Sequence, residues 1–194
     1  MTKSMRTFML TAAVLALTGS SAFAQATIHG DLVKDWASQK DTIVKIANAM
    51  PEDKFGFKAT PAQRSFGEQV LHIAQVNVML LGALGGKTPA PMINMKATGK
   101  AEIVKAVADS FDYGTAVVKE FDNKTIQDTV QAPFMGPSTR ARIVFFLNAH
   151  SQDIYGQMAV YLRLNGHVPP AQEKLDQRAV RSPLRGWKPR GAVA

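Results

Sequence analysis

The sequence contains no cysteine among its 194 residues. This absence excludes disulfide bonds, thiolate metal ligands, a cysteine nucleophile and a lipid-anchored cysteine. Histidine is scarce too, with four residues in the whole chain, so few side chains remain that bind a transition metal well. A glycine-rich phosphate loop, a Gly-x-Ser-x-Gly nucleophile motif and paired carboxylates on the apolar helix faces are also missing. The commonest nucleotide-binding and hydrolytic motifs are therefore not present.

The first 24 residues have the pattern of a secretion signal. Two basic residues precede an apolar run, residues 8–17, that is about half as long as a membrane-spanning helix requires. Ala22 and Ala24 then provide the small-residue pattern of a cleavage site. The alternative is an uncleaved membrane anchor, which the short apolar run disfavours. We expect residues 1–24 to be a signal peptide and the mature protein to be periplasmic or secreted.

The positive charge of the chain is concentrated near its end. The formal net charge is +8, from 23 lysines and arginines against 15 acidic residues. Residues 171–194 contain six basic and two acidic residues, whereas residues 25–170 contain 15 basic and 13 acidic residues. We expect residues 171–194 to be a disordered, solvated tail, with weak contact to anionic surfaces as the alternative. The nearly balanced body argues against specific binding of nucleic acid.

Apolar residues recur at helical spacing in four segments, residues 28–50, 65–84, 100–121 and 137–166. Ser65 and Glu68 form a capping box at the start of the second segment, and Gly166 follows the last one as a helix-ending glycine. Gly114, inside the third segment, is expected to permit close packing. Residues 129–134 are expected to be briefly extended. The pattern predicts an all-α four-helix bundle over residues 25–170, with an up-down-up-down arrangement expected.

The last predicted helix, with Pro137 in its first turn, has an apolar face interrupted by polar residues. That face is predicted to contain Ile143, Phe146, Leu147, His150, Ile154, Gln157, Tyr161 and Leu164. A buried polar group needs a partner, so His150 is either a hydrogen-bonded core histidine or a metal ligand. His72, on the second predicted helix, is the other histidine expected near the inside. Two histidines alone are a weak indication of a metal site.

Two blocks of sequence resemble the DinB-like family. The first consists of MPEDKFGFK at residues 50–58 and RSFGEQVLHIA at residues 64–74, and the second is HSQDIYGQMAVYLRLNGHVPP at residues 150–170. The resemblance implies a four-helix bundle that, in many members, binds one divalent metal through three histidines. One is on the second helix and two are four residues apart on the last. Some members are thiol-dependent transferases or isomerases, and others resemble metal-dependent hydrolases.

The resemblance implies that His72 and His150 are the first two metal ligands. The third position is residue 154, where Ile154 cannot bind a metal. Asp153 is the candidate substitute, although it could equally face solvent or bond to His72. Two histidines and a carboxylate would suit Zn, Ni, Fe or Mn and support a hydrolase- or transferase-like activity. The alternative is a metal-free binding or structural bundle that has lost its third ligand and its catalysis.

Gln157 and Tyr161 follow residue 154 by about one and two helical turns. They are candidate pocket residues that would orient a small-molecule ligand, and hydrogen bonding between helices is the alternative role. Export argues against the thiol-dependent chemistry of the family, because the low-molecular-weight thiols that it uses are cytosolic. The resemblance is also compatible with a homodimer.

Overall fold

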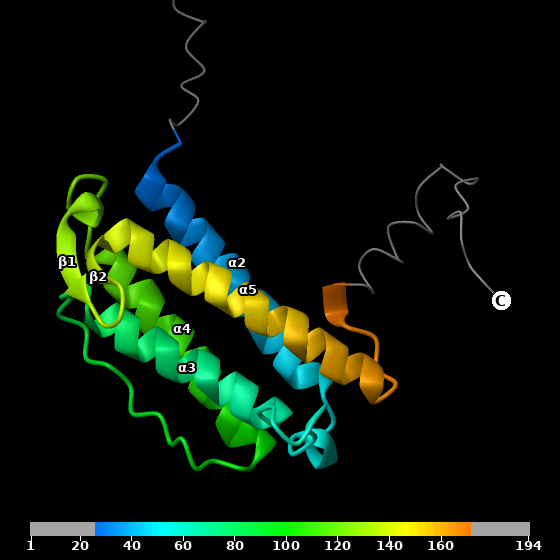
Figure 1. The fold of residues 1–194 in the computed structure, drawn as a ribbon. Helices are drawn as coiled ribbons and strands as arrows, with labels where there is room; N and C mark the ends of the chain where they lie inside the picture. Colours follow the sequence, from blue (N-terminus) through cyan, green and yellow to red (C-terminus); the bar gives the residue numbers. More distant parts are fainter. Residues whose placement is uncertain (1–25, 172–194) are drawn as a thin grey trace, which may run out of the picture.

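The computed structural model describes residues 26–171 (Figure 1). The predicted signal peptide and all but Ala171 of the predicted basic tail lie outside this range. Four long α-helices occupy most of the described part: α2 (Ile28–Ala49), α3 (Phe66–Gly82), α4 (Lys100–Lys119) and α5 (Arg140–Leu164). Shorter elements are η1 (Glu52–Lys54), η2 (Thr125–Gln127), β1 (Thr129–Ala132) and β2 (Gly136–Thr139). The predicted all-α four-helix bundle is confirmed.

Side-chain caps fix where three of the helices begin. Thr27 accepts a hydrogen bond from the Gly30 amide at the start of α2, and Thr139 caps α5 in the same way. At α3 the predicted capping box is present, because Ser65 accepts from the Glu68 amide while the Glu68 carboxylate accepts from the Ser65 amide. Each cap satisfies a backbone donor that the first helical turn leaves without a partner.

The helices run up-down-down-up, which corrects the expected up-down-up-down order. Asn77 of α3 donates to Ser110 of α4 over 3.2 Å, and Gly86 beyond α3 lies beside Val117 near the end of α4. These two helices are therefore parallel, and Figure 1 shows α2 and α5 running the opposite way. The physical reason is the connection formed by residues 83–99. It is long enough to return along the whole bundle before α4 begins (Figure 1).

A β-hairpin precedes α5, in the place where the sequence suggested the first turn of the helix. Residues 129–132 form β1, in agreement with the expected extended stretch. Pro137 instead lies on β2, paired with Gln131, and α5 starts three residues later. Proline is tolerated on an edge strand, and this two-stranded sheet consists only of edges. Phe134 and Gly136 both have positive φ, which closes the turn.

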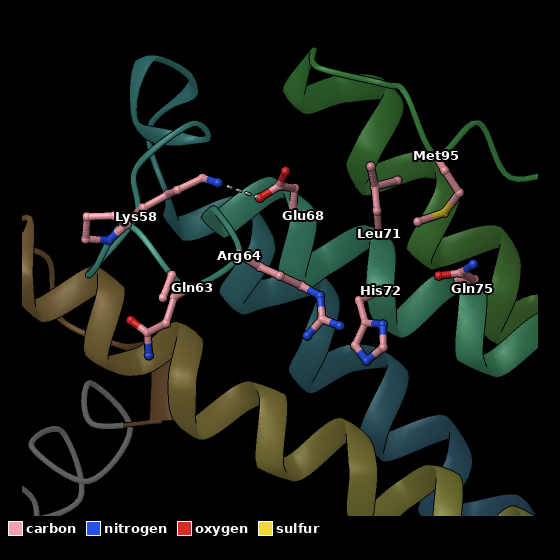
Figure 2. Close-up of a pocket in the computed structure, with 10 residues that line it drawn as sticks. Lys58, Gln63, Arg64, Glu68, Leu71, His72, Gln75 and Met95 are labelled. Atoms are coloured by element: carbon pink, nitrogen blue, oxygen red, sulfur yellow. Dashed lines mark ion pairs between the residues drawn. The ribbon is translucent and has the colours of Figure 1, made fainter. Parts of the chain in front are cut away.

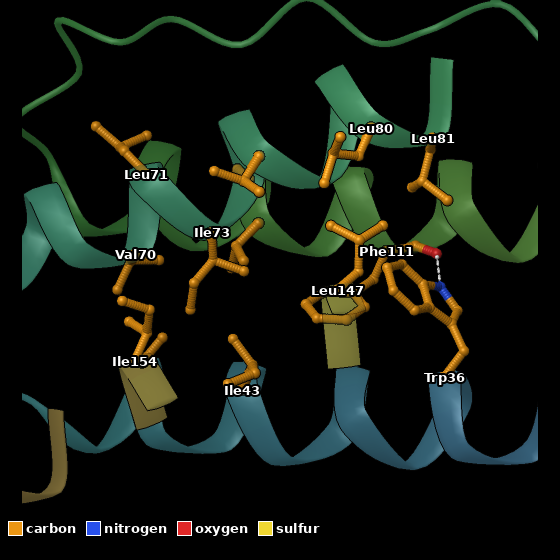
Figure 3. Packing of buried hydrophobic residues seen from close by; sticks show 14 of the residues in the cluster. Trp36, Ile43, Val70, Leu71, Ile73, Leu80, Leu81, Phe111, Leu147 and Ile154 are labelled. Carbon is orange, nitrogen blue, oxygen red and sulfur yellow. Dashed lines mark hydrogen bonds between the residues drawn. The ribbon is translucent and has the colours of Figure 1, made fainter. Parts of the chain in front are cut away.

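The core lies between the four helices and consists mainly of apolar side chains (Figure 3), with Asn77, Ser110 and Ser151 among the few fully buried polar residues. Trp36 of α2 packs against Phe111 of α4, with ring centroids 4.8 Å apart, and its indole N–H donates to the Phe111 carbonyl over 2.9 Å. Gly114 is the residue that allows this approach, because a Cβ atom there would lie 2.6 Å from Trp36 Cε2. The close packing expected at Gly114 is therefore present.

The buried face of α5 is rotated relative to the predicted one. Phe146 and Leu164 are 36% and 59% exposed, although both were expected on the core face. The buried residues are Ile143, Val144, Leu147, Ser151, Ile154, Met158, Ala159, Tyr161 and Leu162. Because α5 packs against both α2 and α3, its buried arc turns toward α2 as well. His150 and Gln157 consequently lie at the border with α3. No helix within residues 26–171 has the length and apolar character needed to cross a bilayer.

Candidate functional site

The two interior histidines meet across the α3–α5 interface. These helices are antiparallel, because His72 contacts His150 while the earlier residue Gln69 contacts the later residue Gln157. The Nε2 atoms of the two imidazoles are 3.2 Å apart, and the rings stand edge to face with centroids separated by 5.0 Å. Both side chains are half-buried. At this distance one ring nitrogen donates a hydrogen and the other accepts it.

The surroundings keep both imidazoles neutral. Burial is the largest cause that lowers the pKa of His72, to about 4, and the positive charges of Arg64 and His150 lower it further. Burial also lowers the pKa of His150, and Asp153 partly opposes this while Arg64 adds to it. Burial disfavours the charged form of an imidazole. At neutral pH the pair is therefore uncharged and suited to hydrogen bonding.

An aromatic stack covers the pair on the α5 side. The Phe146 ring lies nearly parallel to the His150 ring, at an interplanar angle of 17° and a centroid distance of 6.2 Å. Phe134, at the tip of the β-hairpin, stands edge-on to Phe146 with centroids 6.1 Å apart. The hairpin that replaces the first predicted turn of α5 thus extends the apolar wall next to His150.

Asp153 is held by a chain of side-chain amides. Gln69 Nε2 donates to Gln157 Oε1 over 2.7 Å, and Gln157 Nε2 donates to Asp153 Oδ2 over 3.0 Å. Gln157 therefore makes the interhelical hydrogen bond that was the alternative to a ligand-binding role. Asp153 itself is exposed on α5. Its carboxylate is close enough to affect the pKa of His150 but is already engaged by Gln157.

Ile154 occupies the position where the resemblance implies a third histidine. It is 3% exposed and points into the core with Val70 and Ile43 (Figure 3). Within residues 26–171, no three side chains of histidine, cysteine, aspartate or glutamate come together in a way that would hold a metal ion. The three-ligand set implied by the resemblance therefore does not fit the residues present, and the assignment of His72, His150 and Asp153 to a metal stays a prediction.

Tyr161 belongs to the core rather than to an open cavity. It is 1% exposed, and its hydroxyl donates to the backbone carbonyl of Arg64 over 2.8 Å. Its ring also meets Phe57 edge to face, with centroids 5.9 Å apart. Through these contacts Tyr161 fixes the segment that leads into α3.

A pocket of about 430 Å³ opens beside His72 (Figure 2). The residues around it are Lys58, Pro61, Ala62, Gln63, Arg64, Glu68, Leu71, His72, Gln75 and Met95. Figure 2 shows the Arg64 guanidinium directed toward the His72 imidazole. Lys58 pairs with Glu68 at 3.5 Å. Polar and charged groups thus form one side of the pocket, while Leu71 and Met95 provide apolar surface.

The model of the DinB superfamily matches residues 36–158 of the chain. The chain belongs to the DinB superfamily. Among solved structures, a DinB-like protein from Bacillus cereus superposes with a TM-score of 0.64 at 17% identity, covering 72% of this chain and 93% of that one. A DinB-like protein from Bacillus subtilis gives 0.57 at 14% identity, covering 71% and 94%. None of the curated proteins matches the chain.

In this DinB bundle the sequence located the histidine pair but missed most of the pocket around it. Helical spacing placed His72 and His150 near the inside, and the family resemblance implied that they come together. Arg64 and Gln63 were not identified as site residues, because they precede the helix and carry no spacing pattern. The available signal was that Arg64 directly precedes the N-cap Ser65, and a residue there lies at the end of the bundle beside the first turn of α3.

Proposed function

We propose that this DinB-superfamily chain is an exported bundle that binds a small molecule in the pocket beside His72 without a three-ligand metal centre. The observation that carries the proposal is the buried position of Ile154, at 3% exposure, where the resemblance implies the third ligand. Filling the core there with an aliphatic side chain favours packing over coordination. The N-terminal pattern of residues 1–24 supports the export part of the proposal.

The pocket has the general properties of a ligand site. Its volume of about 430 Å³ falls in the range typical of small-molecule pockets, about 300–1,000 Å³. His72 at its wall offers a ring nitrogen for hydrogen bonding, and Gln75 offers an amide. Leu71 and Met95 provide the apolar contact that most ligand sites use for affinity.

Metal titration of wild type beside Ile154→His tests the proposal. We expect zinc or nickel to leave the melting temperature of the chelator-treated wild type unchanged. The melting temperature of Ile154→His should rise strongly when metal is added, because this variant restores the implied spacing of two histidines on one helical face. Ile154→Gln is the matched control, since it places a polar side chain of similar size at residue 154 without an imidazole. Stoichiometric metal binding by the wild type that is lost in His72→Ala would contradict the proposal.

A metal-dependent activity is the second candidate, and the spacing of the histidine pair favours it. Metal–nitrogen bonds of about 2.0–2.1 Å in a tetrahedral site place two ligand nitrogens about 3.3 Å apart. The Nε2 atoms of His72 and His150 are 3.2 Å apart, which suits that arrangement. Asp153 would complete a set for Zn, Ni, Fe or Mn by leaving its bond with Gln157. The same titration separates the two candidates.

A further inference from the structure

We propose that the pocket beside His72 recognises an anionic group, a carboxylate or a phosphate, through the guanidinium of Arg64. The inference rests on the proposed role of this pocket in binding a small molecule and adds the chemical class of that molecule. It concerns Arg64 and its polar neighbours and does not depend on whether the histidine pair holds a metal.

Within residues 26–171, no acidic group forms an ion pair with the positive charge of Arg64. Across residues 26–171 its guanidinium makes neither an ion pair nor a side-chain hydrogen bond. A guanidinium keeps its charge at all physiological pH values. The side chain is exposed and borders the pocket, so an incoming ligand can reach it. An unpaired arginine at the wall of a pocket is a ready partner for an oxyanion.

The acidic groups in the neighbourhood are already occupied. Glu68 accepts from the Ser65 amide over 2.6 Å as part of the capping box and pairs with Lys58 at 3.5 Å. Asp153 accepts from Gln157 and is not among the residues that line the pocket. Lys58 and Glu68 cancel each other, which leaves the charge of Arg64 in excess. The pocket therefore attracts anions and repels cations.

The backbone that carries Arg64 is fixed on both sides. The buried hydroxyl of Tyr161 donates to the Arg64 carbonyl over 2.8 Å, and Ser65, the next residue, caps α3. The Phe66 amide, one residue further, donates to the Phe57 carbonyl over 3.0 Å. Because the stem of the arginine starts from a rigid point, less conformational entropy is lost when the guanidinium binds a ligand. Tyr161 thus acts as a positioning residue for Arg64.

Neutral polar groups beside Arg64 complete a site for an oxyanion with an attached organic body. Gln63, Gln75 and His72 line the same pocket and provide side-chain donors. Figure 2 shows the Arg64 guanidinium and the His72 ring on one side, with Gln75, Leu71 and Met95 further along. An acidic head at Arg64 would leave the rest of a small ligand against Leu71 and Met95. The ligand class is therefore a small organic acid or a phosphate ester.

Calorimetric titration of the full chain, freed of metal by chelator, tests this inference. The probes are inorganic phosphate, succinate and the uncharged analogue succinamide. We expect phosphate or succinate to bind and succinamide not to bind. Arg64→Gln should lower the affinity for the anion about tenfold or more, because it removes a charge-assisted hydrogen bond. Arg64→Lys should give an intermediate loss, since it keeps the charge but not the planar fork.

Lys34→Gln is the charge-matched control. Lys34 lies near the start of α2, at the opposite end of the bundle from Arg64, and its side chain is 77% exposed. This variant should change anion affinity by less than about twofold, because distant exposed charges are screened by salt. Tighter binding of phosphate would identify a phosphate ester as the ligand class, and tighter binding of succinate would identify an organic acid.

Three results would overturn the inference: no binding of either anion, equal binding by wild type and Arg64→Gln, or equal binding of succinate and succinamide. None of them bears on the metal titration with Ile154→His, which separately decides whether the bundle lacks a three-ligand metal centre. Unchanged melting temperatures for Arg64→Gln would show that a lost affinity does not come from unfolding. The backbone carbonyl that Tyr161 uses is retained in this variant, so its fold should be preserved.

Discussion

Gly114 and Trp36 show how a single missing side chain sets the spacing of two helices. The indole of Trp36 lies directly over the Gly114 position of α4 and donates to the Phe111 carbonyl. Gly in a helix interior costs about 1 kcal/mol relative to alanine. The fold accepts that cost because the large aromatic ring is then 1% exposed and well packed.

Replacing Gly114 with alanine should destabilise the protein by about 1–3 kcal/mol, because the new methyl group would overlap the Trp36 ring. Denaturant unfolding gives the free-energy change. Gly156→Ala is the matched control, since Gly156 lies within α5 and a Cβ atom there meets nothing within 4 Å. That variant should instead gain about 0.5–1 kcal/mol from helix propensity. An equal effect of the two substitutions would contradict the packing explanation.

Single residues also show what the sequence could reveal about the site. Spacing on the helices placed His72 and His150 near the inside of the bundle, and the resemblance paired them and identified residue 154 as the missing position. Which side chains of α5 point into the core depends on the helices that pack against it. These tertiary contacts, with α2 and α3, cannot be derived from the spacing of apolar residues in α5 alone. Phe146 consequently became a wall beside His150 instead of a core residue.

Among the elements, the connection formed by residues 83–99 accounts for the relative direction of α3 and α4. This connection allows α3 and α4 to run parallel. Glu120, at the end of α4, holds the first residues of the connection in place. The Glu120 carboxylate accepts hydrogen bonds from the amides of Lys87 and Thr88 and from the Thr88 hydroxyl, at 2.6 to 2.9 Å. The spacing of apolar residues describes each helix separately. It could therefore not predict that this connection runs back along the bundle and makes α4 parallel to α3.

The attachment of this connection should depend on pH. Hydrogen bonds from the Thr88 side chain, then from the Lys87 and Thr88 amides, lower the pKa of Glu120 below its ordinary value of 4.5. The stabilising contribution is therefore complete above pH 4.5 and is lost as the pH falls through the lowered pKa. Protection factors of the Lys87 and Thr88 amides, measured by NMR hydrogen exchange, should decrease as the pH is lowered from 4.5 through the pKa of Glu120. The same fall in Glu120→Gln would contradict the assignment.

The β-hairpin is the element that sequence reasoning recognised only in part. Residues 129–132 were expected to be extended, but Pro137 was interpreted as a helix-starting proline. Thr139 is the actual cap, and its side chain accepts from the Arg142 amide. Proline fits both the first turn of a helix and an edge strand, so local preference does not separate the two. The pairing of Gln131 with Pro137 decides between them.

Across the whole molecule, the up-down-down-up order brings four distant segments to one end. The α2–α3 connection, the start of α3, the start of α4 and the end of α5 meet there (Figure 1). Lys100 at the start of α4 reinforces this end by donating to the carbonyls of Asn48 and Met50, over 2.8 and 2.7 Å. The pocket with Arg64 is built at that end, from segments that are separate in the sequence. Its composition could therefore not be read from any single motif.

The central claim is that this bundle contains the histidine pair but holds no three-ligand metal centre, because the buried side chain of Ile154 occupies the position of the third ligand. The most direct measurement is the metal content of the protein, expressed from its full 194-residue sequence and purified without chelator, by mass spectrometry of the elements. We expect far less than one equivalent of any transition metal per chain. One equivalent that remains through purification, and that disappears in His72→Ala, would contradict the claim.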